Sequence, residues 1–187
     1  MNFDYTMSKE QADILSSLIG KRIIATLSIL DSGDSAGEYV LVFEDEEIVI
    51  NAKEESSDVP WLDDTRVVEI VRRPSGSADG NLLFPKQIDD TIIGISRIVT
   101  TMTHKNADKV HPDTAQYDRG IILHFSHRDL VIDRGEESWS EIWRATWANT
   151  GSMQFGASTP DPEYPDFSMV SAVHVIDSEQ RSPRERK

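Results

Sequence analysis

Residues 38–56 read EYVLVFEDEEIVINAKEES, and this stretch decides which fold the sequence favours. Apolar segments at 39–43 and 47–51 flank a polar centre made of Glu44, Asp45 and Glu46. Short apolar runs on both sides of a polar turn are typical of a β-hairpin. We therefore expect two antiparallel strands here, with the acids near the tip.

The same pattern returns 82 residues downstream, where LVFEDEEIVINAKEES (41–56) corresponds to LHFSHRDLVIDRGEES (123–138). Seven of these sixteen positions are identical. A second match pairs IGKRIIAT (19–26) with IGISRIVTT (93–101), with one residue inserted. An internal duplication explains both matches, with pseudo-repeats at about 19–73 and 93–147. Two unrelated hairpins that draw on the same residue types are the alternative.

Other elements follow from spacing and capping signals. Ser8 and Gln11 form a capping box before apolar residues at helical spacing, and Gly20 is placed to end that helix. The segments 22–29, 65–73 and 168–176 read as strands, and both faces of the last could be buried. Ser138 and Glu141 form a second possible capping box, which permits a helix near 138–147.

These elements predict an α+β fold that is mainly antiparallel β. Neither half could bury its apolar face alone, so we expect the duplicated strand–loop–hairpin units to form a sheet pair or a partly closed barrel. Residues 1–180 are expected to form a single domain, and 181–187 a disordered basic tail.

Composition narrows the classes of function. The absence of cysteine excludes disulfides and thiol chemistry, and no apolar run approaches the ~20 residues that span a bilayer. The start lacks the basic-then-apolar pattern of a signal peptide, so we expect a cytoplasmic protein without a membrane role. The net charge is −14, and residues 31–90 hold 16 acids against 5 bases. Such a field repels nucleic acid and attracts a basic partner, although acidity can also serve solubility alone.

The repeat suggests a test of the acidic tip. Glu44, Asp45 and Glu46 correspond to Ser126, His127 and Arg128 in the second copy, so the fold does not require an acidic hairpin tip. This favours display of the acids to a partner. The downstream pair at 54–55 recurs at 136–137, which favours a structural role for that pair.

The histidines and the tryptophans leave other functions open. His104, His111, His124 and His127 cluster loosely but lack the spacing of a zinc site, and ordinary surface or strand histidines explain them better. No nucleotide-binding or hydrolase motif occurs, so the sequence argues for neither an enzyme nor a cofactor. The regular spacing of tryptophans at 139, 143 and 147 suits a core plug or an exposed binding face.

With its acidic FEDEE hairpin in a small cysteine-free β-rich chain, the sequence resembles bacterial toxin-immunity proteins of the polymorphic or contact-dependent inhibition type. The resemblance implies a stoichiometric inhibitor of a basic toxin domain, for example a nuclease, that acts without a cofactor. The alternatives are a structural or regulatory subunit with a tryptophan-rich face, and a small β-barrel enzyme or metal-binding protein that uses the histidines. The predicted partner-binding residues are Glu44, Asp45, Glu46, Glu47, Asp58, Trp61, Asp63 and Asp64.

Overall fold

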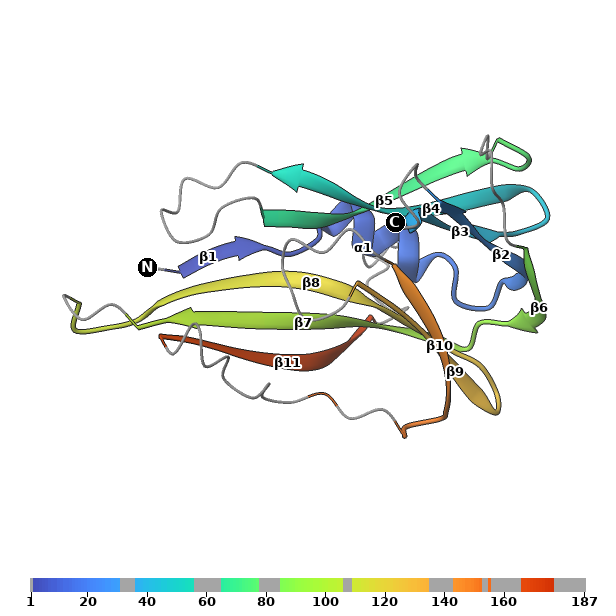
Figure 1. Ribbon diagram of the computed structural model, residues 1–187. Coiled ribbons are helices and arrows are strands. Elements are labelled where there is room, and N and C mark those ends of the chain that lie inside the picture. The colour runs from blue at the N-terminus through green and yellow to red at the C-terminus, as the bar shows by residue number, and fades with distance from the viewer. Residues whose placement is uncertain are drawn as a thin grey trace, which may run out of the picture.

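The computed structural model shows two mainly antiparallel sheets that pack face to face, with one α-helix among the described residues (Figure 1). No described helix has the length and apolar character needed to cross a membrane. The residues that the structure describes are 2–30, 36–55, 65–77, 85–105, 109–134, 143–152, 155 and 166–176.

The helix α1 (Lys9–Ser16) begins where the sequence predicts it. The Ser8 side chain accepts a hydrogen bond from the Gln11 backbone N–H at 3.3 Å, and the Gln11 side chain accepts one from the Ser8 N–H at 2.9 Å. Both capping-box bonds are therefore present. After the helix a turn runs to Gly20, whose φ of +87° suits a residue without a Cβ atom.

The first sheet has five strands. Four consecutive strands form a meander, and the fifth returns to pair with the first of them, which confirms the hairpin expected at 38–56. Across the sheet the order is β5 (Thr65–Pro74), β4 (Glu46–Glu55), β3 (Ala36–Val42), β2 (Arg22–Leu30) and β6 (Lys86–Thr91).

The second sheet has the same plan, with one addition. A short N-terminal strand, β1 (Asn2–Tyr5), joins it by parallel pairing with β8. The order of its other strands is β10 (Arg144–Asn149), β9 (Arg128–Asp133), β8 (Asp113–His124), β7 (Gly94–His104) and β11 (Phe167–Ile176).

The two hairpins have the same register. Leu41 pairs with Ile48 in the first sheet, and Leu123 pairs with Leu130 in the second, so both strands keep the offset of 82 seen in the sequence. The offset does not extend to the next strand, because Glu46 faces residue 74 and Arg128 faces residue 149, which differ by 75.

The sequence match of 19–26 with 93–101 does not agree with the strand pairing in the two sheets. Gly20 was matched with Gly94, but Gly20 lies in the turn before β2, whereas Gly94 pairs with His124 inside its sheet. The residue that holds the corresponding place in the first sheet is Ala25, which pairs with Val42. The structural correspondence between β2 and β7 is therefore shifted from the one read in the sequence.

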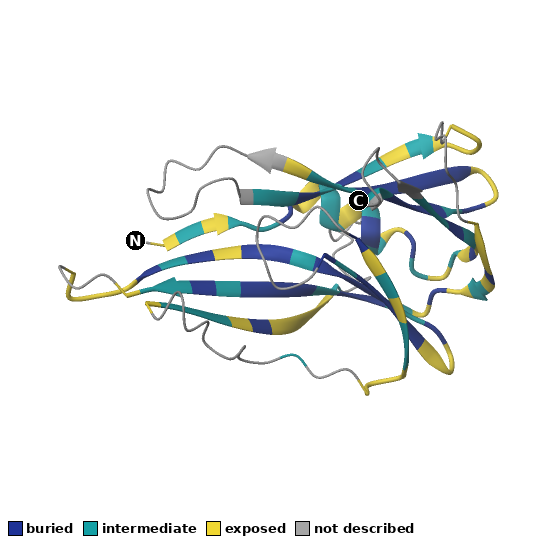
Figure 2. Cartoon of the chain, in the orientation of Figure 1, coloured by how far each residue is buried: buried dark blue, intermediate teal, exposed yellow. Residues whose placement is uncertain are grey.

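The main core lies between the two sheets. Buried side chains of both sheets, with Leu15 and Leu18 of the helix segment, form one cluster, and Figure 2 shows buried residues along the central strands of both layers. Residues of the first sheet in this cluster include Tyr39, Leu41 and Ile48, all at 3% exposure or less. Paired residues of antiparallel strands share a face, so these positions identify the inner face of the first sheet.

Three expectations need correction. Residues 144–149 form strand β10, so the helix permitted at 138–147 is wrong at its C-terminal end; residues 135–142 lie outside the described part. Of the two expected arrangements, the structure has the sheet pair rather than the partly closed barrel. Strand β11 is not buried on both faces: it lies at the end of the second sheet, and Val170, Val173 and Val175 are exposed.

Candidate functional site

The acidic hairpin ends in a two-residue loop. The Phe43 N–H donates to the Glu46 carbonyl at 2.9 Å and closes the turn. Glu44 and Asp45 occupy the loop, and both are exposed. Of the four consecutive acids at 44–47, these two therefore have side chains exposed to a partner.

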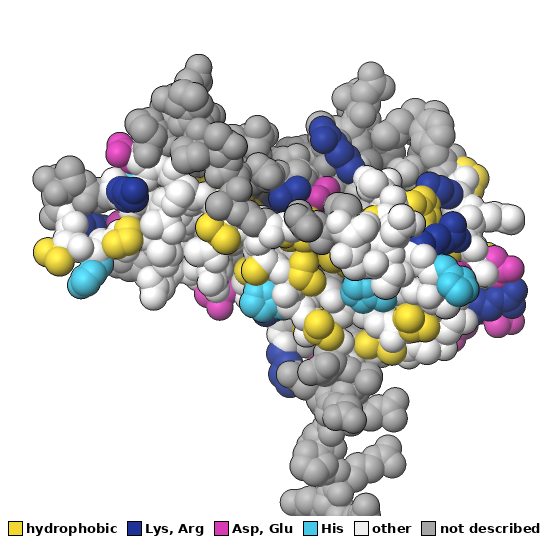
Figure 3. Space-filling view, turned by 90° about the horizontal axis from the view of Figure 1, so that it is seen from below, with side chains coloured by type: hydrophobic (Ala, Val, Ile, Leu, Met, Phe, Trp, Pro, Cys, Tyr) yellow, Lys and Arg dark blue, Asp and Glu magenta, His cyan; other side chains and the backbone are white. Residues whose placement is uncertain are grey.

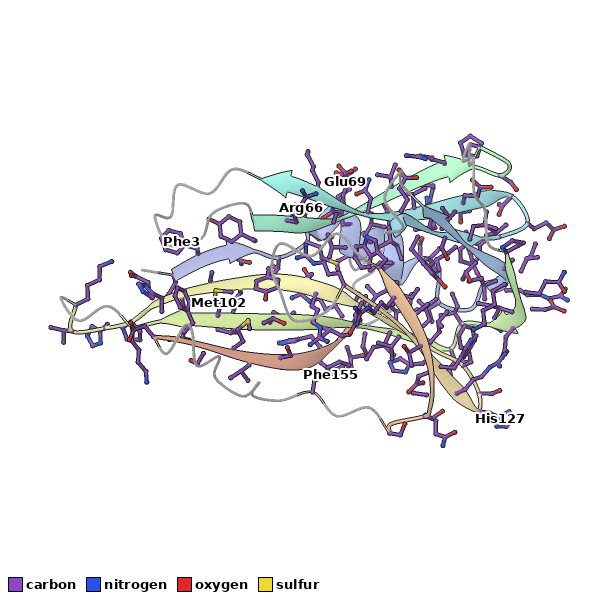
Figure 4. The ribbon with its side chains drawn as sticks, viewed as in Figure 1. Phe3, Arg66, Glu69, Met102, His127 and Phe155 are labelled. Carbon is purple, nitrogen blue, oxygen red and sulfur yellow. The ribbon has the colours of Figure 1, made fainter. Side chains whose placement is uncertain are left out.

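The second hairpin closes in the same way. The Phe125 N–H donates to the Arg128 carbonyl at 3.0 Å, and the loop residues Ser126 and His127 are exposed. Figure 4 shows His127 at the outer end of this hairpin. Equivalent backbone geometry is thus built once with two acids and once with a serine and a histidine, so the acids at 44–45 meet no requirement of the turn.

Glu46 serves the scaffold. It is 8% exposed. One carboxylate oxygen forms an ion pair with Lys21, and the other forms an ion pair with Arg72 Nε at 2.7 Å. A carboxylate that is buried and paired on both oxygens is costly to withdraw from its partners. The structure therefore engages Glu46 internally rather than leaving it on display.

Glu47 is also engaged internally. It is 3% exposed, and its Oε1 accepts the Gly76 N–H at 2.7 Å, in the turn that follows β5. The second sheet repeats the contact, because Asp129 Oδ2 accepts the Gly151 N–H at 3.0 Å in the turn after β10. Both glycines have positive φ, as a tight turn requires. An acid at this position holds the neighbouring turn in each sheet.

The other predicted contact residues, Asp58, Trp61, Asp63 and Asp64, lie outside the described residues. The chain enters that segment from Glu55, at the end of the ten-residue β4 opposite to the tip. At roughly 3.3 Å per residue, β4 separates Glu55 from the tip by about 30 Å. The two groups of predicted residues are thus approached from opposite ends of one strand.

The histidines do not converge. Among the described residues no group of three or more His, Asp or Glu side chains is arranged to hold a metal ion. His111 and His127 are exposed, and His104 stacks on Phe167 with ring centroids 4.6 Å apart. Nothing in these contacts brings the four histidines to one site.

His124 takes part in a relay that the sequence did not reveal. Its Nδ1 lies 2.9 Å from Asp129 Oδ1 and its Nε2 lies 2.9 Å from Ser96 Oγ. This is the hydrogen-bond order of a nucleophilic triad. Ser96 is only 1% exposed, however, and neither of the two best-defined cavities includes any of the three residues. A nucleophile needs access to its substrate, so we interpret these hydrogen bonds as structural contacts that join β7, β8 and β9.

The tryptophans point toward the core. Trp143 is 4% exposed and belongs to the core between the sheets. Trp147 packs against that core, 5.7 Å from Phe125 between ring centroids, and its ring lies 3.8 Å from the guanidinium carbon of Arg128. Trp139 lies outside the described residues. For the two described tryptophans the core-plug interpretation holds better than an exposed binding face.

A comparison of the chain with protein-family models, curated proteins and solved structures found no match. Inference about function therefore rests on the residues and their geometry.

Proposed function

We propose that this protein binds and neutralises a basic protein partner, in the manner of an immunity protein that inhibits its cognate toxin. The observation that carries the proposal is the exposed pair Glu44 and Asp45, on a loop whose counterpart carries Ser126 and His127. Because the backbone accepts either pair, the acids are available for recognition.

The charge of the chain supports this proposal. The net charge is −14, and the segment 31–90 that contains the acidic hairpin has 16 acids and 5 bases. A negative surface attracts a positive one before contact and accelerates association at low salt. The positively charged groove of a nuclease toxin is the kind of partner that such a surface would fit.

We further propose that the two sheets arose by duplication. Their common strand order, the shared hairpin register and the repeated acid-to-glycine contact at Glu47 and Asp129 support it. In this view one copy of an ordinary hairpin gained two acids at its tip after the duplication. The core positions stayed apolar because both copies bury the same face.

The tip alone cannot supply a tight interaction. Exposed ion pairs contribute roughly 0.2–1 kcal/mol each, so two acids account for about a 2- to 30-fold change in affinity. Further contacts must come from elsewhere on the chain. Asp58, Trp61, Asp63 and Asp64 remain proposed contributors, with Trp61 as the apolar anchor.

The test is capture of partners by the tagged protein from its native host at about 50 mM and about 500 mM NaCl. The variant E44S/D45H replaces the acidic tip with the residues of the second tip. We expect a basic protein that wild type retains at low salt, that high salt releases, and that the variant retains weakly.

The matched control is E10S/D13H, which makes the same two exchanges on exposed positions of α1. It changes the net charge equally and should retain the partner as wild type does. If both variants lose the partner alike, total charge rather than the tip is responsible. If E44S/D45H retains it fully, the acidic tip has no part in binding.

A further inference from the structure

Two hydroxyl side chains of β2 face the space between the sheets. Thr26 pairs with the core residue Leu41, and Ser28 pairs with Tyr39, so both hydroxyls lie on the inner face. Their apolar neighbours Ala25 and Leu27 point to the other side of the sheet. The inner faces of a sandwich normally form an apolar core, so polar residues there indicate a different use.

A buried indole N–H lies at the same place. Trp143 is 4% exposed, and its Nε1 has no hydrogen-bond partner among the described residues. Buried tryptophan N–H groups usually find an acceptor, and leaving one unpaired carries a desolvation penalty. The donor is therefore available to an acceptor that the described residues do not supply.

These groups line a cavity of about 410 Å³ between β10 and the strands β2, β3 and β6. Small-molecule pockets range from about 300 to 1,000 Å³, so the cavity suits a small ligand. Its walls include Thr26, Ser28, Tyr39, Lys86, Trp143 and Ala145.

The chemistry of the walls defines the ligand. The Tyr39 hydroxyl donates to Thr26 Oγ1 at 3.0 Å, and burial raises the pKa of Tyr39, so it stays a neutral donor. The Thr26 hydroxyl proton is then free to point to a ligand. Lys86, which pairs directly with Thr26 across the strands, is exposed and adds a positive charge. Among the described residues that line the cavity, none is a carboxylate.

A second cation contacts the same tryptophan ring as Lys86. The Lys86 ammonium is 5.5 Å from the centroid of the Trp147 ring, and the Arg128 guanidinium is 3.8 Å from it. In a chain with a net charge of −14, two cations at one tryptophan mark a locally positive site. An anion would be favoured here and disfavoured over the acidic part of the chain.

We propose that this cavity binds a small aromatic carboxylate. Its ring lies among Trp143, Tyr39 and Ala145, and its carboxylate accepts hydrogen bonds from Lys86 and from the hydroxyl of Thr26 or the indole of Trp143. This site is separate from the acidic tip, and its ligand need not affect the protein partner.

The test uses benzoate as the probe and benzamide as its neutral isostere. The indole N–H signals of the ¹⁵N-labelled full chain report binding by NMR without any substitution of Trp143. We expect benzoate to shift the Trp143 signal saturably, with a Kd of roughly 0.1–1 mM for so small a ligand, and benzamide to bind at least about fivefold more weakly.

The variants K86M and T26V remove one donor each with little change in volume, and each should weaken benzoate about fivefold or more. K105M, on an exposed residue beyond the far end of β7, is the matched control and should bind as wild type. Absence of a saturable shift, or equal binding by K86M and K105M, would overturn the proposal and leave a water-filled cavity. The E44S/D45H variant should still bind benzoate, which separates this result from that of the partner test.

Discussion

Asp118 holds the segment before α1 against the second sheet from a fully buried position. Its Oδ2 accepts the Met7 N–H at 2.5 Å and lies 3.7 Å from Arg97 Nη1. Its Oδ1 has no hydrogen-bond partner among the described residues. Burial outweighs these favourable contacts and raises the pKa of Asp118 above 3.8.

The raised pKa predicts how stability depends on pH. A carboxyl whose pKa is higher in the folded state contributes stability that is fully present below pH 3.8 and is lost as the pH rises through its folded-state pKa. The difference in unfolding free energy between wild type and D118N should therefore fall with rising pH over this window and then level off. Urea unfolding of both proteins at a series of pH values measures it. A difference that rises with pH would mean that the ion pair with Arg97 dominates.

Residue-scale roles were the hardest to read from the sequence. Glu46 and Glu47 look like members of an exposed acidic run, yet both are engaged internally. Their partners Lys21, Arg72 and Gly76 are 25 or more residues away, and only the pairing of the strands brings them close. The exposed pair at 44–45 was predictable because a tip position depends on the turn alone.

At the scale of elements, hydrophobic alternation predicted the hairpins well. It missed β1, β6 and β10, which are short strands at places where the local pattern is mixed. Two residues four positions apart, such as Trp143 and Trp147, share a face in a helix and also in a strand, so their spacing does not distinguish the two. The pairing of residues 144–149 with β9 shows that this segment is a strand. The inner face of β2 also depends on pairing: Ile23 is in the core, the register shifts between Ile23 and Ala25, and beyond the shift Thr26 pairs with the core residue Leu41.

Strand β8 provides a prediction at this scale. A Cβ atom on Gly120 would collide with the backbone carbonyl oxygen of Ile132 on β9, whereas one on Gly94 would meet its nearest atom, of His124, at 3.5 Å. We expect G120A to lower the unfolding free energy by roughly 2–3 kcal/mol, because the strands would have to separate. G94A is the matched control and should change it by less than about 1 kcal/mol. Equal effects of the two substitutions in urea unfolding would show that the close approach at Gly120 is not rigid.

At the scale of the whole molecule, the exposed valines of β11 and the acidic excess dominate the surface. Figure 3 shows hydrophobic side chains on the face seen from below Figure 1, the side on which β11 lies. Strand β11 carries no Asp, Glu, Lys or Arg from Phe167 to Ile176. The net charge of −14 therefore falls on other parts of the chain and leaves this edge uncharged.

The excess charge predicts a response to salt. Repulsion among unpaired acids weakens the compact state, and added salt screens it. The melting temperature should rise between about 50 mM and about 500 mM NaCl, by about 2–4 °C for each kcal/mol gained. Calorimetry at constant pH measures the change. A fall with salt would show that surface ion pairs such as Arg22–Asp89 contribute more than the repulsion removes.

The parallel pairing of β1 with β8 has a consequence for the order of events during synthesis. Residues 2–5 leave the ribosome more than a hundred residues before their partners at 114–117. The first sheet can complete its meander and receive β6 before β7 to β11 of the second sheet are made. Strand β1 therefore stays without its partner until β8 is made, although it precedes every strand of the first sheet along the chain.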